Sequence, residues 1–314
     1  MNVKKPTIIK YVVDIALIIV LSFMYYLNQP IKSPRVLYVP KGSITKIISQ
    51  LKLQNNQISK LDALILRLLG SPQSGWIDMK ETLNAKGDFL YKLTKAKAAL
   101  RDVTLIPGET AYIFLNQLAR DFNLDIKKLQ DEYDEQTDTP DGNFVPDTYR
   151  VPIGLTEKEL MGLLLKISNA KMKELSIKFF GNYNRTKWLH YVAIASVIQK
   201  ESANTQEMPI VSSVIRNRLK KGMKLQMDGT LNYGEYSHVK VTPKRIREDS
   251  SVYNTYLRDG VPASPVCNVG VDAIIAAIFP ANTNYLYFMK SKEGTHDFSR
   301  NYSTHLTNIK RATK

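Results

Sequence analysis

Residues 193–208 read AIASVIQKESANTQEM, and a carboxylate, Glu201, stands where the apolar face of a helix should continue. Counting back from Glu201 in steps of four gives Val197, Ala193 and Leu189, so the apolar positions recur with helical spacing. Such a glutamate either frays into water at the end of its helix or is held in an apolar wall. In a wall, lost solvation raises the pKa of the carboxyl and keeps it protonated near neutrality, as a general acid requires. The helix pattern alone leaves both interpretations open.

The composition of the whole chain limits the classes of protein to consider. Its 314 residues suffice for two domains, and 44% hydrophobic and 23% charged residues are typical of globular protein. Lys and Arg outnumber Asp and Glu by 44 to 29, and the net charge of +15 suits nucleic acid, an anionic membrane or a polymer bearing carboxylates. The single cysteine, Cys267, excludes an intrachain disulfide, and the four histidines lack the spacing of a zinc motif, so no metal site is predicted.

A membrane span is predicted near the N-terminus. The segment YVVDIALIIVLSFMYYL (11–27) belongs to an apolar run over residues 8–27, and about twenty helical residues cross a hydrocarbon core. No small-residue cleavage site follows, which favours an anchor over a cleaved signal peptide, and a soluble buried helix is the other alternative. Lysines within residues 1–10 predict a cytoplasmic tail, a span in the cell inner membrane and an extracytoplasmic remainder. This topology places the basic region in the wrong compartment for nucleic acid.

The region after the span contains a weak internal repeat. A short stalk is predicted at residues 28–35. Residues 36–51 (VLYVPKGSITKIISQL) and 103–118 (VTLIPGETAYIFLNQL) then align without a gap, and each predicts a strand, a turn and a helix. Two copies are too few for a solenoid, so residues 36–150 are predicted to form one α+β region. The other predicted elements are helices at 62–70, 80–97, 122–133, 155–168 and 209–223, strands at 75–79 and 284–290, and a loop at 131–142.

The helix predicted at 209–223 carries a basic face. Four cations on one side of it are predicted to meet an anionic membrane and a polymer that bears carboxylates, and they are Arg216, Arg218, Lys220 and Lys221. The loops that follow are rich in Asn, Gln, Tyr and Pro. Amides, hydroxyls and aromatic rings of this kind are typical of a cleft that binds sugars.

An ordered set of motifs resembles the endolytic murein transglycosylases, the YceG-like family. The motifs are FVPDTY (144–149), IASVIQKES (194–202), VIRNRL (214–219), GMKLQMDGT (222–230), YNTY (253–256), NVG (268–270), NYLYF (284–288) and HDFS (296–299). The resemblance covers most of residues 36–309. It implies cleavage of the β-1,4 bond between N-acetylmuramic acid and N-acetylglucosamine in nascent peptidoglycan, leaving 1,6-anhydromuramic ends that terminate strand elongation.

The resemblance also implies a site and a domain plan. The family's catalytic glutamate falls on Glu201, and no cofactor is implied. The residues expected to position the sugars are Gln226, Asp228, Tyr253, Asn254 and His296. The expected fold is α+β, with a single transmembrane helix, a LysM-like α/β subdomain at about residues 103–150, and a mixed α+β catalytic domain at 151–314. Peptidoglycan strands and the cytoplasmic membrane are the expected partners, with peptidoglycan synthases as further candidates.

Three loops depart from the family pattern. Asp228-Gly229-Thr230 stands where the family has Asp-Pro-Thr, and the other departures lie at 250–252 and 262–265. Because they fall in loops, these changes are expected to alter subsite geometry more than the reaction.

Two alternatives remain beside the transglycosylase. Asp228 could serve as a second carboxylate in a hydrolytic muramidase. The chain could also be a non-enzymatic scaffold that binds glycan and recruits synthases. A nucleic-acid binder rests on charge alone, because aromatic and basic residues do not alternate as such binders require.

Overall fold

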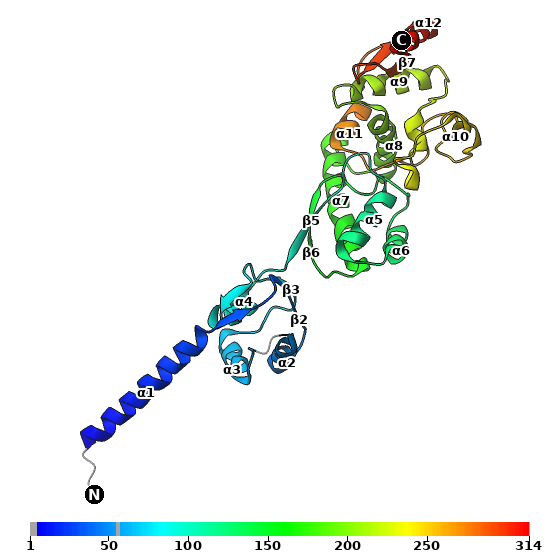
Figure 1. Ribbon diagram of the computed structural model, residues 1–314. Helices are drawn as coiled ribbons and strands as arrows, with labels where there is room; N and C mark the ends of the chain where they lie inside the picture. Colours follow the sequence, from blue (N-terminus) through cyan, green and yellow to red (C-terminus); the bar gives the residue numbers. More distant parts are fainter. Residues whose placement is uncertain (1–4, 55–56, 314) are drawn as a thin grey trace. The chain divides into compact units, whose positions relative to one another are not determined.

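The computed structural model describes residues 5–54 and 57–313, and it has the mixed α+β composition predicted from the sequence (Figure 1). These residues form two compact units. The first unit contains residues 5–54 and 57–101 together with Arg150–Gly154, and the second contains Asp102–Tyr149 together with residues 155–313. The predicted LysM-like region therefore lies in the same unit as the helix that carries Glu201.

The N-terminal helix α1 (Lys5–Leu27) contains the predicted span. Its segment Ile8–Leu27 is 20 residues long with a mean hydropathy of 2.1, which is long and apolar enough to cross a membrane. The helix begins at Lys5, inside the tail predicted for residues 1–10, and residues 1–4 of that tail lie outside the described chain. Side chains along the span are exposed, as Ile18 at 62% illustrates. The protein itself therefore does not cover this apolar surface.

The first unit pairs short strands in two ribbons. Its elements are β1 (Pro30–Lys32), β2 (Val36–Val39), α2 (Ile44–Gln54), α3 (Lys60–Leu69), β3 (Gly75–Asp78), β4 (Leu83–Ala85) and α4 (Lys86–Lys95). β1 pairs antiparallel with β4, and β2 pairs antiparallel with β3. Residues 30–32, expected in a stalk, thus form a strand whose Ile31 is buried. The helix predicted at 80–97 is wrong over its first part, because residues 83–85 form β4.

Both copies of the internal repeat have the predicted strand, turn and helix. β2 and α2 form the first copy, while β5 (Leu100–Thr104) and α5 (Ala111–Phe122) form the second. In each copy a further helix and a strand follow, namely α3 and β3, or α6 (Ile126–Gln136) and β6 (Thr148–Pro152), and the two strands pair. The loop predicted at 131–142 is wrong in its first half, since α6 continues to Gln136.

The rest of the second unit is a helical body with small additions. Its elements are α7 (Glu157–Phe180), α8 (Arg185–Glu201), α9 (Met208–Lys220), the 3-10 turns η1 (Asp228–Leu231) and η2 (Gly234–Tyr236), α10 (Pro243–Glu248), α11 (Val271–Ile278), the hairpin β7 (Tyr287–Lys290) and β8 (His296–Ser299), and α12 (Tyr302–Thr313). The long helix α7 starts with a capping box formed by Thr156 and Glu159. The Asn184 side chain caps the first turn of α8 by accepting a hydrogen bond from the N–H of Lys187.

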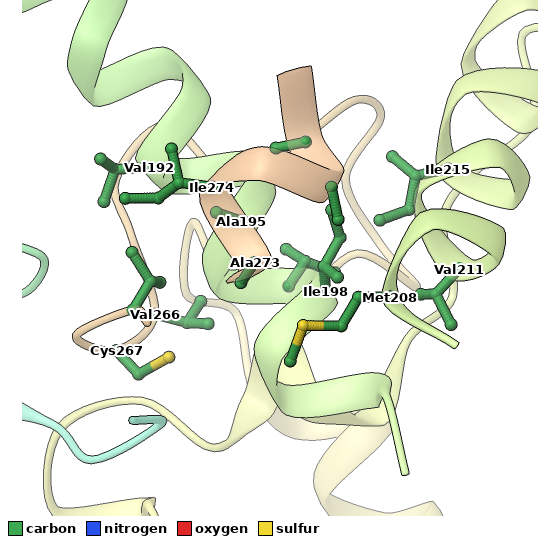
Figure 2. Packing of buried hydrophobic residues seen from close by; sticks show 14 of the residues in the cluster. Val192, Ala195, Ile198, Met208, Val211, Ile215, Val266, Cys267, Ala273 and Ile274 are labelled. Atoms are coloured by element: carbon green, nitrogen blue, oxygen red, sulfur yellow. The ribbon is translucent and has the colours of Figure 1, made fainter. Parts of the chain in front are cut away.

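The core of this body encloses α8. Figure 2 shows Val192, Ala195 and Ile198 of α8 packed beside Ile274 of α11 and Val211 of α9. All five side chains are buried, with at most 3% of their surface exposed. Burial of apolar surface on several sides fixes the rotation of α8 about its axis, because any turn would drive apolar side chains into water. The direction in which the last turn presents Glu201 is therefore determined by this packing.

Candidate active site

Glu201 is the last residue of α8, and its side chain is held rather than frayed. Its Oε1 accepts a 2.6 Å hydrogen bond from the backbone N–H of Gly229 in η1. The pKa of the carboxyl is raised to about 7, chiefly because burial outweighs the hydrogen bond from Gly229. The charge of Asp228 contributes to the rise, and the charge of Arg218 opposes it. A carboxyl with this pKa carries its proton for a large part of the time near neutral pH.

Glu201 lines a cleft of about 250 Å3. The cleft combines polar and apolar side chains, and the C-terminal hairpin contributes some of both kinds. It is lined by Glu201, Arg218, Leu225, Gln226, Met227, Asp228, Tyr256, Phe288, Met289, Lys290 and His296. Three of the residues predicted to bind sugar, namely Gln226, Asp228 and His296, are thus brought together with Glu201.

The other two predicted residues lie behind this cleft. Asn254 is fully buried, and its side-chain amide donates to the backbone carbonyls of Ile246 and Asp249 at 2.9 and 2.7 Å. Its Oδ1 accepts from the N–H of Tyr256 at 3.0 Å, so Asn254 fixes the loop that carries Tyr256. Tyr253 is also buried and stacks on another tyrosine ring. Neither of the two belongs to the lining of the cleft.

Tyr256 lines the cleft, whereas the sequence assigned this role to its neighbours Tyr253 and Asn254. Its hydroxyl donates a 2.6 Å hydrogen bond to Oδ1 of Asp228. Burial raises the pKa of Tyr256, and the hydrogen bond to Asp228 adds to that rise, so the phenol keeps its proton. The YNTY motif contained this residue, but nothing in the motif distinguished the ring that faces the cleft from the one that packs inward.

The basic face predicted on the 209–223 helix is wrong for Arg218. This residue is buried, and its guanidinium donates to the backbone carbonyl of Leu286 at 2.6 Å and to that of Leu225 at 2.7 Å. Arg218 therefore connects Leu225, which lines the cleft, to Leu286, which directly precedes β7. Arg216 is half-buried and donates to a backbone carbonyl, which leaves Lys220 and Lys221 as the exposed cations.

His296 enters the cleft as part of a pair that the sequence did not predict. The carboxylate of Glu207, which lies at the start of α9, accepts from the backbone N–H of His296 and contacts its ring Nδ1, both at 2.7 Å. Both side chains are almost buried, at 11% exposure for His296 and 9% for Glu207. Burial raises the pKa of Glu207, but the hydrogen bonds from His296 outweigh it and the net shift is downward. Because Nδ1 of His296 contacts Glu207, Nε2 is the ring nitrogen that remains for a ligand. Glu207 follows Glu201 by six positions, and no local pattern marks it as a site residue.

The described residues also define what the site lacks. Within residues 5–54 and 57–313, no group of three or more His, Cys, Asp or Glu side chains is placed to hold a metal ion.

The fold and the site together define the class of this protein. It is an α+β protein with an apolar N-terminal helix and a cleft that contains one partly protonated glutamate. The chain belongs to the YceG-like family, whose sequence model matches residues 37–311. A protein of Bacillus subtilis (strain 168) named endolytic murein transglycosylase is 27% identical over 258 residues, which cover 80% of this chain and 69% of that protein.

A second relative with the same name comes from Streptococcus pneumoniae (strain ATCC BAA-255 / R6). It is 25% identical over 267 residues, covering 82% of this chain and 47% of the relative, so the chain spans about half of the pneumococcal protein. The crystal structure of a yceG-like protein from Listeria monocytogenes superimposes with a TM-score of 0.59 at 21% identity, covering 89% of this chain and 99% of that one. This likeness shows that the two proteins share a fold.

Proposed function

We propose that this protein is an endolytic lytic transglycosylase of peptidoglycan. It would cleave the β-1,4 bond between N-acetylmuramic acid and N-acetylglucosamine in nascent strands, leave 1,6-anhydromuramic ends and so terminate elongation. The observation that carries the proposal is the carboxyl of Glu201, whose pKa is raised to about 7 inside a cleft lined by polar side chains. The names of the related proteins from Bacillus and Streptococcus support the same activity.

One carboxyl can carry both proton transfers of this reaction. Oε1 of Glu201 accepts from Gly229, so the proton of the acid is available on Oε2. Glu201 gives that proton to the glycosidic oxygen as the bond from this oxygen to C1 of the N-acetylmuramic acid breaks. The resulting carboxylate then takes the proton of the C6 hydroxyl of the same N-acetylmuramic acid, and the oxygen of this hydroxyl, in place of water, bonds to C1. Ordinary glycosidases need a second carboxylate as nucleophile or base, whereas here the substrate supplies the nucleophile.

The remaining cleft residues have positioning roles in this proposal. Gln226, Asp228 and His296 hydrogen-bond the sugars, since all three line the cleft beside Glu201. The negative charge of Asp228 also favours the positive charge that develops at C1. Tyr253 and Asn254 act indirectly by fixing the loop that carries Tyr256.

The rest of the chain would place this chemistry at the cell wall. We assign α1 as a single span of the cytoplasmic membrane, because residues 8–27 are long and apolar enough. The lysines that precede the span support an orientation with the N-terminus in the cytoplasm and the catalytic region (151–314) outside. The strand–helix–helix–strand unit around residues 103–150 is assigned as a LysM-like glycan-binding element. Peptidoglycan synthases that make the strand are the proposed protein partners.

Mass analysis of digested peptidoglycan tests the activity. The wild-type chain should release fragments with 1,6-anhydro ends, and Glu201→Gln should release none while still binding glycan, because the amide keeps the shape but has no proton to give. Loss of general acid–base catalysis alone costs about 10²–10⁴ in rate. Anhydro ends from Glu201→Gln at the wild-type rate would refute the assignment of Glu201.

The same experiment distinguishes the transglycosylase from a second candidate, a two-carboxylate muramidase. Asp228 lies in the cleft with Glu201, as a two-carboxylate muramidase would require. Such an enzyme would produce reducing ends in place of anhydro ends. Glycan binding without any new ends would instead indicate a scaffold.

A further inference from the structure

The outer face of α3 is apolar where a surface helix is ordinarily polar. α3 turns Ala63, Ile65 and Leu66 into the core of the first unit. On the opposite side Leu61, Leu64 and Leu68 are exposed at 41%, 53% and 88%, and their spacing places them in one stripe along the helix, here termed the leucine face.

Two cations border the leucine face. Lys60 and Arg67 are exposed and lie seven positions apart on α3, so both stand along the same edge of the stripe. A helix with leucines on one side and Lys or Arg along the edge is typical of segments that lie in the interface of an anionic membrane.

Polar contacts tie α3 to the end of the membrane helix. The hydroxyl of Tyr26, the penultimate residue of α1, donates to Oδ1 of Asp62 at 2.8 Å and lies 2.7 Å from Oγ of Ser59, the N-cap of α3. Asp62 is fully buried, and the ammonium of Lys86 lies 3.9 Å from it and 4.2 Å from the centre of the Tyr26 ring. These contacts hold α3 beside the C-terminal end of α1 (Figure 1).

We propose that the leucine face of α3 lies on the outer surface of the same membrane that α1 crosses, among anionic lipid headgroups. The inference rests on the proposed span of α1, because Tyr26 then stands at the membrane–water boundary and brings α3 to that level. The three leucines enter the interface while Lys60 and Arg67 meet lipid phosphates. A protein partner would explain the exposed leucines, but the fixed position beside the end of a span and the basic border both favour lipid.

Lipid quenching of a single fluorophore tests this docking in the full-length chain. Cys267 is buried, and burial raises the pKa of its thiol, so a new exposed cysteine can be labelled selectively. Bimane is attached at Leu64→Cys, and nanodiscs are made from phosphatidylglycerol and phosphatidylcholine with a share of lipid brominated near the headgroup. The matched control is Leu100→Cys in the same unit, whose leucine is exposed at 50% against 53% for Leu64. Ile18→Cys, labelled in the same way but read with lipid brominated deep in the chains, reports on the span.

Docking predicts quenching at position 64 that is at least about threefold stronger than at position 100, with quenching at position 18 as well. Lys60→Gln combined with Arg67→Gln should reduce the signal at 64 in anionic discs and leave the signal at 18 unchanged. Quenching at 18 with equal, weak quenching at 64 and 100 would overturn the docking and leave the span intact. A blue-shifted but unquenched label at 64 would mean that protein covers the face and would also overturn it. Absence of quenching at all three positions would refute the span together with the docking.

Discussion

The backbone N–H of Gly229 donates to Oε1 of Glu201 across 2.6 Å, linking η1 to the last residue of α8. A Cβ on residue 229 would lie 2.6 Å from Cβ of Lys200 and 2.8 Å from that same Oε1, so only glycine fits without a shift. The motif resemblance led us to expect proline at this position, and proline has no N–H to give. The departure at 229 therefore contacts the carboxyl of Glu201 itself, whereas the sequence led us to expect that such loop changes alter subsite geometry more than the reaction.

Gly229→Ala should lower the turnover of peptidoglycan without unfolding the protein. The added methyl group displaces the Glu201 carboxyl, and a misplacement of about 1 Å can cost about 10²-fold in rate. The rate of release of anhydro-ended fragments measures the effect. Gly162→Ala in α7 is the matched control, because its Cβ would meet nothing closer than 4.0 Å. Equal rates for the two variants would show that the close approach at Gly229 is unimportant.

The rate should fall as the pH rises through about 7. Burial raises the pKa of Glu201 to about 7, and only the protonated carboxyl can donate to the glycosidic oxygen. A profile of kcat/KM against pH should therefore lose about tenfold per unit on its alkaline side. A profile that stays flat well above neutrality would show that a different group supplies the proton.

Asp228→Asn and Tyr256→Phe should both weaken substrate positioning. The tyrosine hydroxyl donates to Asp228 at 2.6 Å, and loss of one such bond to a charged group costs about tenfold. The loss should appear mainly in KM, and Tyr112→Phe, an exposed tyrosine on α5, is the control. If Asp228→Asn destroys activity as completely as Glu201→Gln, the two-carboxylate hydrolase becomes the better description.

Glu207→Gln should disturb the orientation of the His296 ring. The carboxylate accepts from both the backbone N–H and the ring of His296, and an amide offers a single acceptor oxygen for these two donors. The proton is then expected to leave Nδ1 in a fraction of molecules, which ¹⁵N NMR of the labelled ring detects. Turnover should fall along with this tautomer change. An unchanged ring spectrum would show that Glu207 does not fix the tautomer.

Asp141 should make the fold less stable as the pH rises. Burial raises its pKa to about 8, although the N–H of Ala111 donates to it and the charge of Lys200 lowers its pKa. In the unfolded chain the carboxyl of this residue has its ordinary pKa of 3.8, so the native state binds the proton more tightly. This proton binding stabilises the native state at low pH, and the stabilisation is lost as the pH rises from about 4 through about 8. Asp141→Asn should flatten the curve of unfolding free energy by at most about 1.4 kcal/mol per pH unit, measured with urea. Asp131→Asn, an exposed position on α6, should leave the curve unchanged, and parallel curves for the wild type and Asp141→Asn would contradict the prediction.

Local patterns determined a large part of the architecture. The long apolar helix α1, the two copies of strand, turn and helix, and the helix that ends at Glu201 all follow from runs of hydrophobic residues and their spacing. Such periodicity reflects which side of an element is buried, so it can be read without the rest of the fold. The ordered motifs were likewise sufficient to indicate the family, which the match over residues 37–311 confirms.

Only the tertiary structure decided what surrounds Glu201. The bond from Gly229 joins residues 28 positions apart, and the bond from His296 to Glu207 joins residues 89 apart. Arg218 looked like a surface cation because its helix is basic, but it is buried, and its guanidinium donates both to the nearby carbonyl of Leu225 and to the carbonyl of Leu286, 68 positions away. Asn254 looked like a sugar ligand and binds backbone instead. Sequence spacing records which side of an element faces inward, but the partner of a polar side chain is set by where the chain returns in space, and local periodicity contains no information about that return.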